Sequence, residues 1–390
     1  MRNSWRTRGV AGVGLVLCAW LVCLGGPTQA ADKTPRLAPA LQPFVDRHEL
    51  AGAVLLVADK QAILDVETVG VADIAQQKPM RPDSLFWIAS MSKPITATAL
   101  MLLVDEGLVK IEDPVEKFLP EFKNLWVPVE RSDDRLVLKR PAHPITVREI
   151  LTHTSGLDFR SEMEQPRLDG LKLCDAVRSY TLAPLLWEPG TKFKYSNAGI
   201  NTAGRIIEVV SEMPFEEFLD RRVFKPLGMK DTTFWPNAEQ LTRLAKAYQP
   251  NAAKNDLEEM KIEQLTYPLD DRTRGPMPAG GLFSTAHDCA HLCQMALAGG
   301  LFEGRRFLSE EAVQQMTKRQ TGAGISENWG LGWTAGPSFG HGGALSTNMT
   351  VDTQRGLIFI YLVQHAGYAG TNGAQIYPAF VDAAVQAFGK

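Results

Sequence analysis

The chain has 390 residues, 45% of them hydrophobic and 22% charged, and its formal net charge at pH 7 is −3. A chain of this length and composition can bury a large core, in one domain or in two interlocked lobes. The slight excess of acidic residues argues against a nucleic-acid partner, which would require a basic surface.

Residues 1–30 are predicted to be a secretory signal peptide. Three arginines precede an uncharged apolar run over residues 10–26, and Thr28-Gln29-Ala30 provides the usual cleavage spacing. We expect cleavage after Ala30 and a secreted or periplasmic mature protein. The alternative is an uncleaved membrane anchor, for which a run of about 17 residues is only just long enough; only then would a membrane be a partner. Removing three of the 41 basic residues leaves 38 against 44 acidic ones, a net charge of −6.

The mature chain is expected to fold around a hydrophobic core and not around a disulfide framework. Its cysteines, Cys174, Cys289 and Cys293, are odd in number and cannot all pair. We expect residues 31–41 to form a linker and residues 42–390 to form the folded domain.

Sequence typical of β-strands lies near both ends of the mature chain. Residues 53–58 and 62–66 are separated by a short polar stretch and predict a β-hairpin. Near the other end, residues 344–351 predict one strand and residues 357–363 a clearer one, joined by a turn. An amphipathic stretch over residues 379–388 predicts a closing helix.

The middle of the chain is dominated by helical patterns. A helix is expected to begin at about Ser90 and to continue through apolar residues to Leu103, with a proline tolerated in its first turn. Residues 146–152 and 198–211 also predict helices. Two polar, proline-bearing segments, at 126–144 and 250–281, are candidates for loops that border a cleft.

This arrangement predicts an α+β fold. An antiparallel β-sheet formed from both chain ends would be flanked by helices and would carry an inserted, mostly α-helical lobe. The sheet lobe would contain about residues 42–90 and 330–390, and the helical lobe about residues 91–329. A catalytic cleft would lie between the lobes.

Ser90-Met91-Ser92-Lys93 is the first motif that carries chemistry. A serine and a lysine three residues apart at a helix start lie on one face and can hydrogen-bond, as a nucleophile and its base must. The motif is short, and the alternative is an N-cap serine followed by a solvated lysine.

Two further motifs lie downstream. Tyr195 and Asn197 follow a proline-glycine turn and would project on one side of an extended segment, with Ser196 on the other. His341-Gly342-Gly343 precedes the predicted strand, and paired glycines let a substrate backbone approach the chain. Taken alone, the tyrosine also fits a core aromatic, the asparagine a helix cap and the glycines a turn.

In this order and spacing the three motifs resemble those of the serine β-lactamase and penicillin-binding-protein superfamily, in particular its class C β-lactamase, D-aminopeptidase and family VIII esterase branch. Phrases at residues 145–157, 188–191 and 279–285 also look like that branch. The resemblance spans about residues 40–388 and implies a β-lactamase/transpeptidase-like fold. It is specific for the fold and the nucleophile, not for the substrate.

The resemblance implies a role for each matching residue. Ser90 would attack a carbonyl carbon and form an acyl-enzyme, while Lys93 would accept the serine proton. Tyr195 would shuttle protons to the leaving group and help to activate the deacylating water. Asn197 would hold the substrate amide or the lysine.

The same resemblance implies how the substrate is bound. The backbone N–H groups of Ser90 and Ala344 would form an oxyanion hole, typically worth about 3 kcal/mol per donor. His341, Gly343 and Ala344 would line the substrate site beside Asn197. No metal or other cofactor is expected.

At His341 the chain departs from the β-lactamase pattern, which usually has a lysine there. A lysine is a permanent cation that attracts a substrate carboxylate, whereas a histidine is mostly neutral at pH 7. We therefore expect an exported serine hydrolase that cleaves an ester, a small amide or a D-amino-acid peptide. The alternatives are a β-lactamase or D-Ala-D-Ala carboxypeptidase, and a catalytically silent module that binds peptidoglycan fragments or a partner.

A second serine and a histidine pair were also considered. Gly336-Pro337-Ser338-Phe339-Gly340 matches the Gly-x-Ser-x-Gly elbow, but that elbow requires a helix after the serine and a strand is predicted here, so Ser338 is expected in a turn. His287 and His291 imitate a zinc helix, but Cys289 and Cys293 lie about 200° around the helix from them. An ordinary helix opened by a variant capping box is expected instead, with Thr285 and Asp288 as its pair.

Overall fold

The computed structural model describes residues 36–389, so the predicted signal peptide lies outside the described residues. The helices are α1 (Ala38–Asp46), α2 (Ser92–Asp105), α3 (Val147–Leu151), α4 (Leu173–Ser179), α5 (Asn197–Ser211), α6 (Phe215–Leu219), α7 (Ala238–Arg243), α8 (Ala286–Leu297), α9 (Glu310–Thr317) and α10 (Gly373–Phe388). The strands are β1 (Gly52–Ala58), β2 (Ile63–Asp73), β3 (Lys78–Pro79), β4 (Phe86–Trp87), β5 (Val127–Arg131), β6 (Leu136–Lys139), β7 (Ala247–Pro250), β8 (Leu257–Met260), β9 (Phe283–Ser284), β10 (Leu301–Phe302), β11 (Arg305–Arg306), β12 (Ser338–Gly342), β13 (Asn348–Asp352) and β14 (Leu357–Leu362).

The main sheet joins the two ends of the chain, as the sequence predicts. Its strand order is β12-β13-β14-β1-β2-β3, and β1 pairs antiparallel with β14, with Val54 opposite Leu362. All seven residues of β1 are buried, because alternate side chains enter cores on opposite faces of the sheet. The predicted α+β architecture is confirmed.

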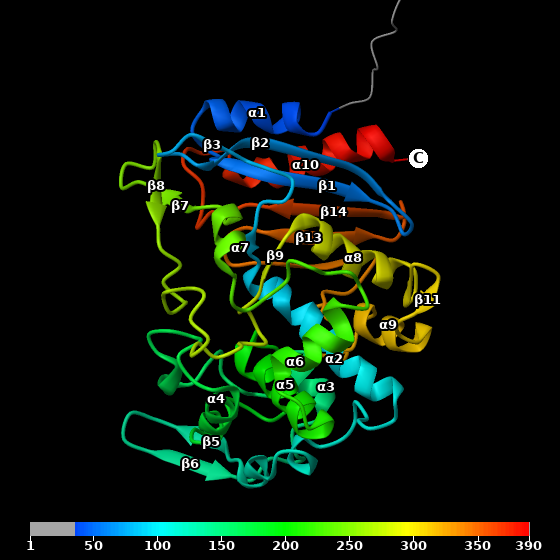
Figure 1. Ribbon diagram of the computed structural model, residues 1–390. Helices are drawn as coiled ribbons and strands as arrows, with labels where there is room; N and C mark the ends of the chain where they lie inside the picture. The colour runs from blue at the N-terminus through cyan, green and yellow to red at the C-terminus, as the bar shows by residue number, and fades with distance from the viewer. Residues whose placement is uncertain (1–35, 390) are drawn as a thin grey trace, which may run out of the picture. The chain divides into compact units, whose positions relative to one another are not determined.

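Helices α1 and α10 cover one face of this sheet (Figure 1). Leu37 and Leu41 lie one turn apart and are fully buried there together with Phe380 of α10. Residues 38–41 therefore belong to a packed helix and not to the predicted linker. The burial of these two leucines on one face stabilises the helix in this segment.

Helix α8 covers the opposite face, where it contacts β1, β13 and β14. Its small and apolar residues, including Cys289 and Cys293, are buried against these strands. The predicted boundary of the helical lobe at about residue 329 is therefore wrong, because the α8 segment packs with the sheet.

The helical lobe is built around α2, which contacts α5, and both of these helices are largely buried. Helix α3 also packs on α5. All three helices begin within a residue or two of their predicted starts. In Figure 1 this lobe lies below the sheet, with the β5–β6 hairpin at its far end.

Three segments differ from the sequence prediction. Residues 126–144, expected as a loop, contain the β5–β6 hairpin, and residues 250–281 contain β8. The strand predicted over 344–351 begins only at Asn348, because residues 344–347 form the turn that follows β12. Ser338 is thus the first residue of a strand and not a turn serine.

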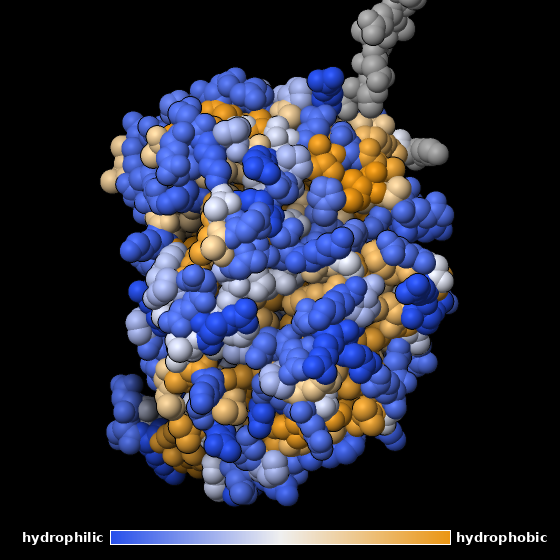
Figure 2. Space-filling model, in the orientation of Figure 1, coloured by the Kyte–Doolittle hydropathy of each residue, from blue (hydrophilic) through white to orange (hydrophobic). Residues whose placement is uncertain are grey.

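The surface is mostly hydrophilic on the face shown in Figure 2, with apolar side chains gathered in smaller patches, some of them over the lower part of the helical lobe. Trp126, Val129 and Leu136 are among the exposed large hydrophobic residues and lie in or beside the β5–β6 hairpin. Within residues 36–389, no helix combines the length and apolar character needed to cross a bilayer.

Candidate active site

Ser90 lies in a single 3-10 turn, Ala89–Met91, immediately before α2. Ala89 adopts a left-handed backbone conformation, with φ of 46°, which is costly for a residue with a side chain. The Ser92 hydroxyl stabilises this turn by donating to the Ala89 carbonyl at 2.7 Å and accepting the Leu282 N–H at 3.2 Å. The turn leaves Ser90 partly accessible while its neighbours Ala89 and Met91 are buried.

Lys93 is a fully buried charged side chain of the helical lobe, with no exposed surface. Its Nζ lies 3.0 Å from Ser90 Oγ, 2.8 Å from Asn197 Oδ1 and 2.7 Å from the Ala279 carbonyl oxygen. It also sits 4.6 Å from the centre of the Tyr195 ring. Burial lowers the pKa of Lys93 well below its ordinary value of 10.5.

The three contacts fit either protonation state of Lys93, and its lowered pKa favours the neutral amine. The Asn197 oxygen and the Ala279 carbonyl can only accept, so they take the two hydrogens of the amine. In the amine form, the lone pair is left to accept from the Ser90 hydroxyl, 3.0 Å away. A neutral lysine held in this way can remove the serine proton.

Tyr195 and His341 meet beside this pair, with the tyrosine hydroxyl 3.4 Å from Nε2 of the histidine. Nδ1 of His341 lies 2.6 Å from the Gly342 carbonyl oxygen and must donate to it, so Nε2 is the acceptor. Burial, with a smaller effect of the Lys93 charge, lowers the pKa of His341 to about 3. Burial raises the pKa of Tyr195, so the phenol stays protonated and donates to His341.

Tyr195 and Asn197 face Lys93 together, whereas Ser196 points away, as predicted. The Ser196 hydroxyl caps α5 by accepting the Gly199 N–H and donates to the Asp158 carbonyl. The cap role considered for Asn197 therefore belongs to Ser196.

The two glycines after His341 differ in what they allow. A side chain at Gly343 would lie 2.1 Å from Thr347 Oγ1 and 2.6 Å from the Ile88 carbonyl, so this glycine lets the chain pack against the turn that carries Ser90. A side chain at Gly342 would meet nothing closer than 3.6 Å. At Gly343, therefore, it is the protein's own backbone that approaches closely, where a substrate backbone was expected. The next residue, Ala344, is exposed.

Three groups at the site were not singled out from the sequence. Ala279 contributes only its carbonyl oxygen. His153 is buried behind Tyr195, with ring centres 4.6 Å apart, and its Nδ1 accepts the Ser196 N–H. Trp329 packs edge-on against Tyr195 and His341. Ala279 and His153 both lie within phrases quoted for the family resemblance.

Neither Ser338 nor the helix that carries His287 and His291 has the surroundings that its alternative role requires. Ser338 is exposed in β12, opposite Asp352, and β12 is followed by β13 and not by the helix that a nucleophile elbow requires. On α8, Thr285 accepts the Asp288 N–H, but the Asp288 carboxylate turns to Thr232 and the Asp231 N–H, so only half of the expected capping box forms. No cluster of three metal-ligating side chains occurs within residues 36–389.

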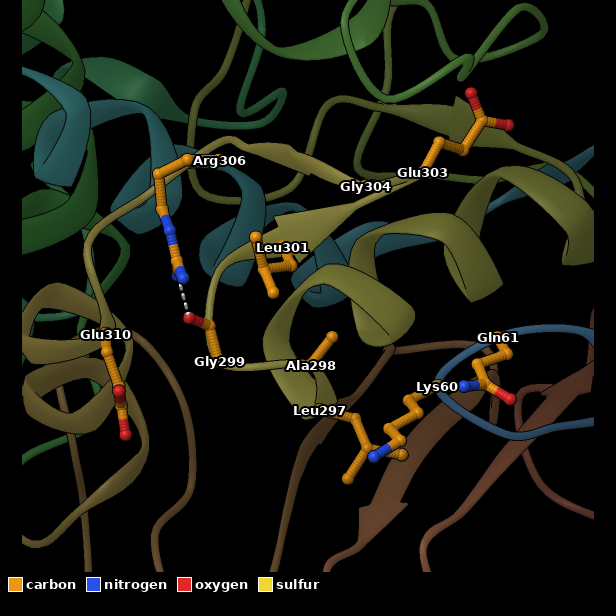
Figure 3. Close-up of a pocket in the computed structure, with 10 residues that line it drawn as sticks. All are labelled: Lys60, Gln61, Leu297, Ala298, Gly299, Leu301, Glu303, Gly304, Arg306 and Glu310. Carbon is orange, nitrogen blue, oxygen red and sulfur yellow. Dashed lines mark hydrogen bonds between the residues drawn. The ribbon is translucent and has the colours of Figure 1, made fainter.

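Figure 3 shows a separate surface pocket of about 590 Å³ at the end of α8 and the β10–β11 hairpin. Its charged residues have both signs, and the Arg306 guanidinium is already bonded to the Gly299 carbonyl. The pocket contains neither Ser90 nor any group bonded to it.

The model of the Beta-lactamase family matches residues 37–380, and the chain belongs to this family of serine hydrolases. Protein Rv1367c of Mycobacterium tuberculosis is 31% identical over 364 residues, which cover 84% of this chain and 88% of that protein. Esterase EstB of Burkholderia gladioli is 30% identical over 381 residues, 91% of this chain and 89% of the esterase.

Solved structures share the fold. EstCE1, described as a hydrolase with promiscuous acyltransferase activity, has a TM-score of 0.75 at 24% identity and covers 90% of this chain and 97% of its own. Simvastatin synthase LovD from Aspergillus terreus has a TM-score of 0.76 at 20% identity, with the same two coverages. The predicted family resemblance is confirmed.

Proposed function

We propose that this protein hydrolyses an ester or amide bond through an acyl-enzyme on Ser90. The observation that carries the proposal is the buried Lys93 amine, which has two acceptors for its hydrogens and Ser90 Oγ at 3.0 Å. An esterase activity is favoured over a peptidase activity because the relative that aligns over 91% of this chain is named an esterase.

In the proposed acylation, Lys93 takes the proton of Ser90 as Oγ attacks the carbonyl carbon. The backbone N–H groups of Ser90 and Ala344 stabilise the resulting oxyanion. Tyr195 donates its proton to the leaving alcohol or amine and recovers one from the Lys93 ammonium. The bond to the leaving group breaks, and the acyl group remains on Ser90.

In deacylation the same groups act on water: the Lys93–Tyr195 pair accepts a proton from it, and Ser90 is the leaving group. A water molecule attacks the acyl carbon while the Lys93–Tyr195 pair takes its proton, and Ser90 is regenerated with a proton from Lys93. The products are the free acid and the free enzyme. Asn197 holds Lys93 in position throughout, which is one of the two roles that the resemblance implies.

The substrates are proposed to be uncharged near the position that His341 faces. With its pKa at about 3, His341 is neutral at physiological pH and offers no cation for a carboxylate. This supports esters or small amides over β-lactams and D-alanyl-D-alanine peptides. We also propose that residues 1–30 direct export, on the basis of their sequence alone.

The proposal predicts that Ser90→Ala lowers kcat/KM for p-nitrophenyl esters about 1,000-fold or more, since the nucleophile is lost. Ser338→Ala is the matched control, because it removes a second serine hydroxyl and should leave the rate unchanged. Equal losses in both variants, or loss only in Ser338→Ala, would reject Ser90. A parallel assay with nitrocefin and a D-alanyl peptide separates the alternatives, and no turnover of any substrate would favour a silent binding module.

A further inference from the structure

Asn201 lies one helical turn after Asn197, on the same face of α5. It is 1% exposed, and its side-chain hydrogen bonds go to residues other than Lys93. Its Oδ1 accepts the Ala279 N–H at 3.0 Å, and its Nδ2 donates to the Tyr180 hydroxyl at 2.8 Å. Asn201 therefore binds the same residue whose carbonyl accepts from Lys93.

Hydrogen bonds through Tyr180 and Glu164 fix the orientation of the Asn201 amide. The Tyr180 hydroxyl donates to Glu164 Oε1 at 2.8 Å, so its oxygen is left to accept from Asn201. The other oxygen of Glu164 accepts the Ser161 N–H. Burial raises the pKa of Tyr180 well above 10, which keeps its hydroxyl a donor.

The peptide between Pro278 and Ala279 is held from both sides. From α2, the Thr96 hydroxyl donates to the Pro278 carbonyl at 2.8 Å. From α5, Asn201 accepts the Ala279 N–H, and Gly204 lies so close that a side chain there would be 2.3 Å from the Pro278 ring. Of Thr96, Asn201 and Gly204, it is Asn201 whose side chain hydrogen-bonds Ala279 itself, at the N–H, while Lys93 donates to the carbonyl of the same residue.

We infer that Asn201, held by Tyr180 and Glu164, is a positioning residue for the Ser90–Lys93 pair. It keeps the Ala279 carbonyl where that carbonyl takes one hydrogen from Lys93, and so directs the lone pair of Lys93 at Ser90. The inference rests on the proposed function, because the consequence for turnover requires Ser90 to be the nucleophile.

The loss of Asn201 should have a directional effect on Lys93. The ammonium form donates three hydrogen bonds and the amine form two, so a carbonyl acceptor stabilises the charged form more. If the Ala279 carbonyl moves away, the pKa of Lys93 falls further. The other titratable side chains facing Lys93 are Tyr195, His341 and His153, and burial already lowers the pKa of both histidines.

The test compares Asn201→Leu with Thr202→Val. Thr202 is the next residue of α5 and is equally buried. Its hydroxyl donates a hydrogen bond to the Ala198 carbonyl of its own helix. Both changes replace a buried polar side chain by an apolar one of similar size, but only the first breaks the contact with Ala279. Tyr180→Phe is a milder second variant that keeps the ring and frees the Asn201 amide.

For Asn201→Leu we expect kcat/KM on a p-nitrophenyl ester to fall about 10- to 100-fold. The acidic limb of its pH profile should move about one pH unit lower than in Thr202→Val. Tyr180→Phe should move the limb in the same direction by less. If the acidic limb has the same pKa in Asn201→Leu and Tyr180→Phe as in Thr202→Val, the inference is overturned. A merely structural defect would lower the rate without moving that pKa.

The pH dependence of the free energy of unfolding gives a second readout that needs no substrate. Lys93 causes the free energy of unfolding to rise with pH above its folded-state pKa. This rise should begin at a lower pH in Asn201→Leu than in Thr202→Val. If the wild-type protein shows no Ser90-dependent hydrolysis, the proposed function fails, yet this shift still tests the hydrogen-bond network. An unchanged stability profile would reject the network on its own.

Discussion

Lys93 has a depressed pKa that couples the chemistry of the site to the stability of the fold. Its amine is completely buried between α2, α5 and the Ala279 carbonyl. Above its lowered pKa and below 10.5, the folded protein holds a neutral amine while the unfolded chain holds an ammonium. The unfolded state binds more protons across this window, so stability rises with pH there.

This predicts a measurable difference between the wild-type protein and Lys93→Met. The difference in their free energies of unfolding should increase with pH across the window, with a slope approaching about 1.4 kcal/mol per pH unit, and should be flat above 10.5. Urea unfolding at a series of pH values measures it. A difference that does not change with pH would show that Lys93 is protonated in the folded protein.

The side chains at the site were predictable from the sequence because each carries a chemical group in a recognisable order. Ser90, Lys93, Tyr195, Asn197 and His341 were all placed at one site by the motifs, and the structure brings them together. Ala279 acts through its main chain, which no residue type signals. Asn201 had a weak signal, as a polar residue one turn from Asn197 on a helix with an apolar periodicity.

At the scale of elements, the turn after β12 is held against the turn that precedes α2. Gly343 makes this possible, because any side chain there would collide with Thr347 and with the Ile88 backbone. Strand β12 escaped prediction because Pro337 and Gly340 are typical of turns. Gly340 is needed inside the strand, since a side chain would lie 2.0 Å from the Met349 carbonyl.

We predict that Gly343→Ala destabilises the protein by about 1–3 kcal/mol, as an overpacked substitution does, and lowers kcat because the Ser90 turn shifts. Gly342→Ala is the control, since its side chain would make only ordinary van der Waals contacts, the nearest at 3.6 Å. Thermal or urea unfolding and ester hydrolysis measure both effects. Similar stability in the two variants would contradict the packing described for this turn.

At the scale of the whole chain, the sheet separates two layers with different roles. One face carries α1 and α10, and the other carries α8 and leads to the helical lobe (Figure 1). The sequence predicted the sheet from its two ends, because the strands of a hairpin and their apolar alternation are local signals. It did not predict that α8 joins the sheet, because which surface a helix packs on is decided by long-range contacts.

The layered arrangement predicts that stability and turnover can be separated. Phe380 is fully buried on α10 against Phe359 and Tyr361 of β14. Phe380→Ala should lower the free energy of unfolding by about 3–5 kcal/mol and leave kcat per folded molecule unchanged. Phe388→Ala, a partly buried position on the same helix, should cost less. A loss of kcat in folded Phe380→Ala would show that the outer layer is coupled to the site.

The central claim is that Ser90 is the nucleophile, and its most direct test is the position of a covalent adduct. The protein is treated with a fluorophosphonate, and the modified residue is located by peptide mass spectrometry. We predict one adduct, on Ser90, that is absent from Ser90→Ala and retained in Ser338→Ala. An adduct on Ser338, or no Ser90-dependent adduct at all, would contradict the account.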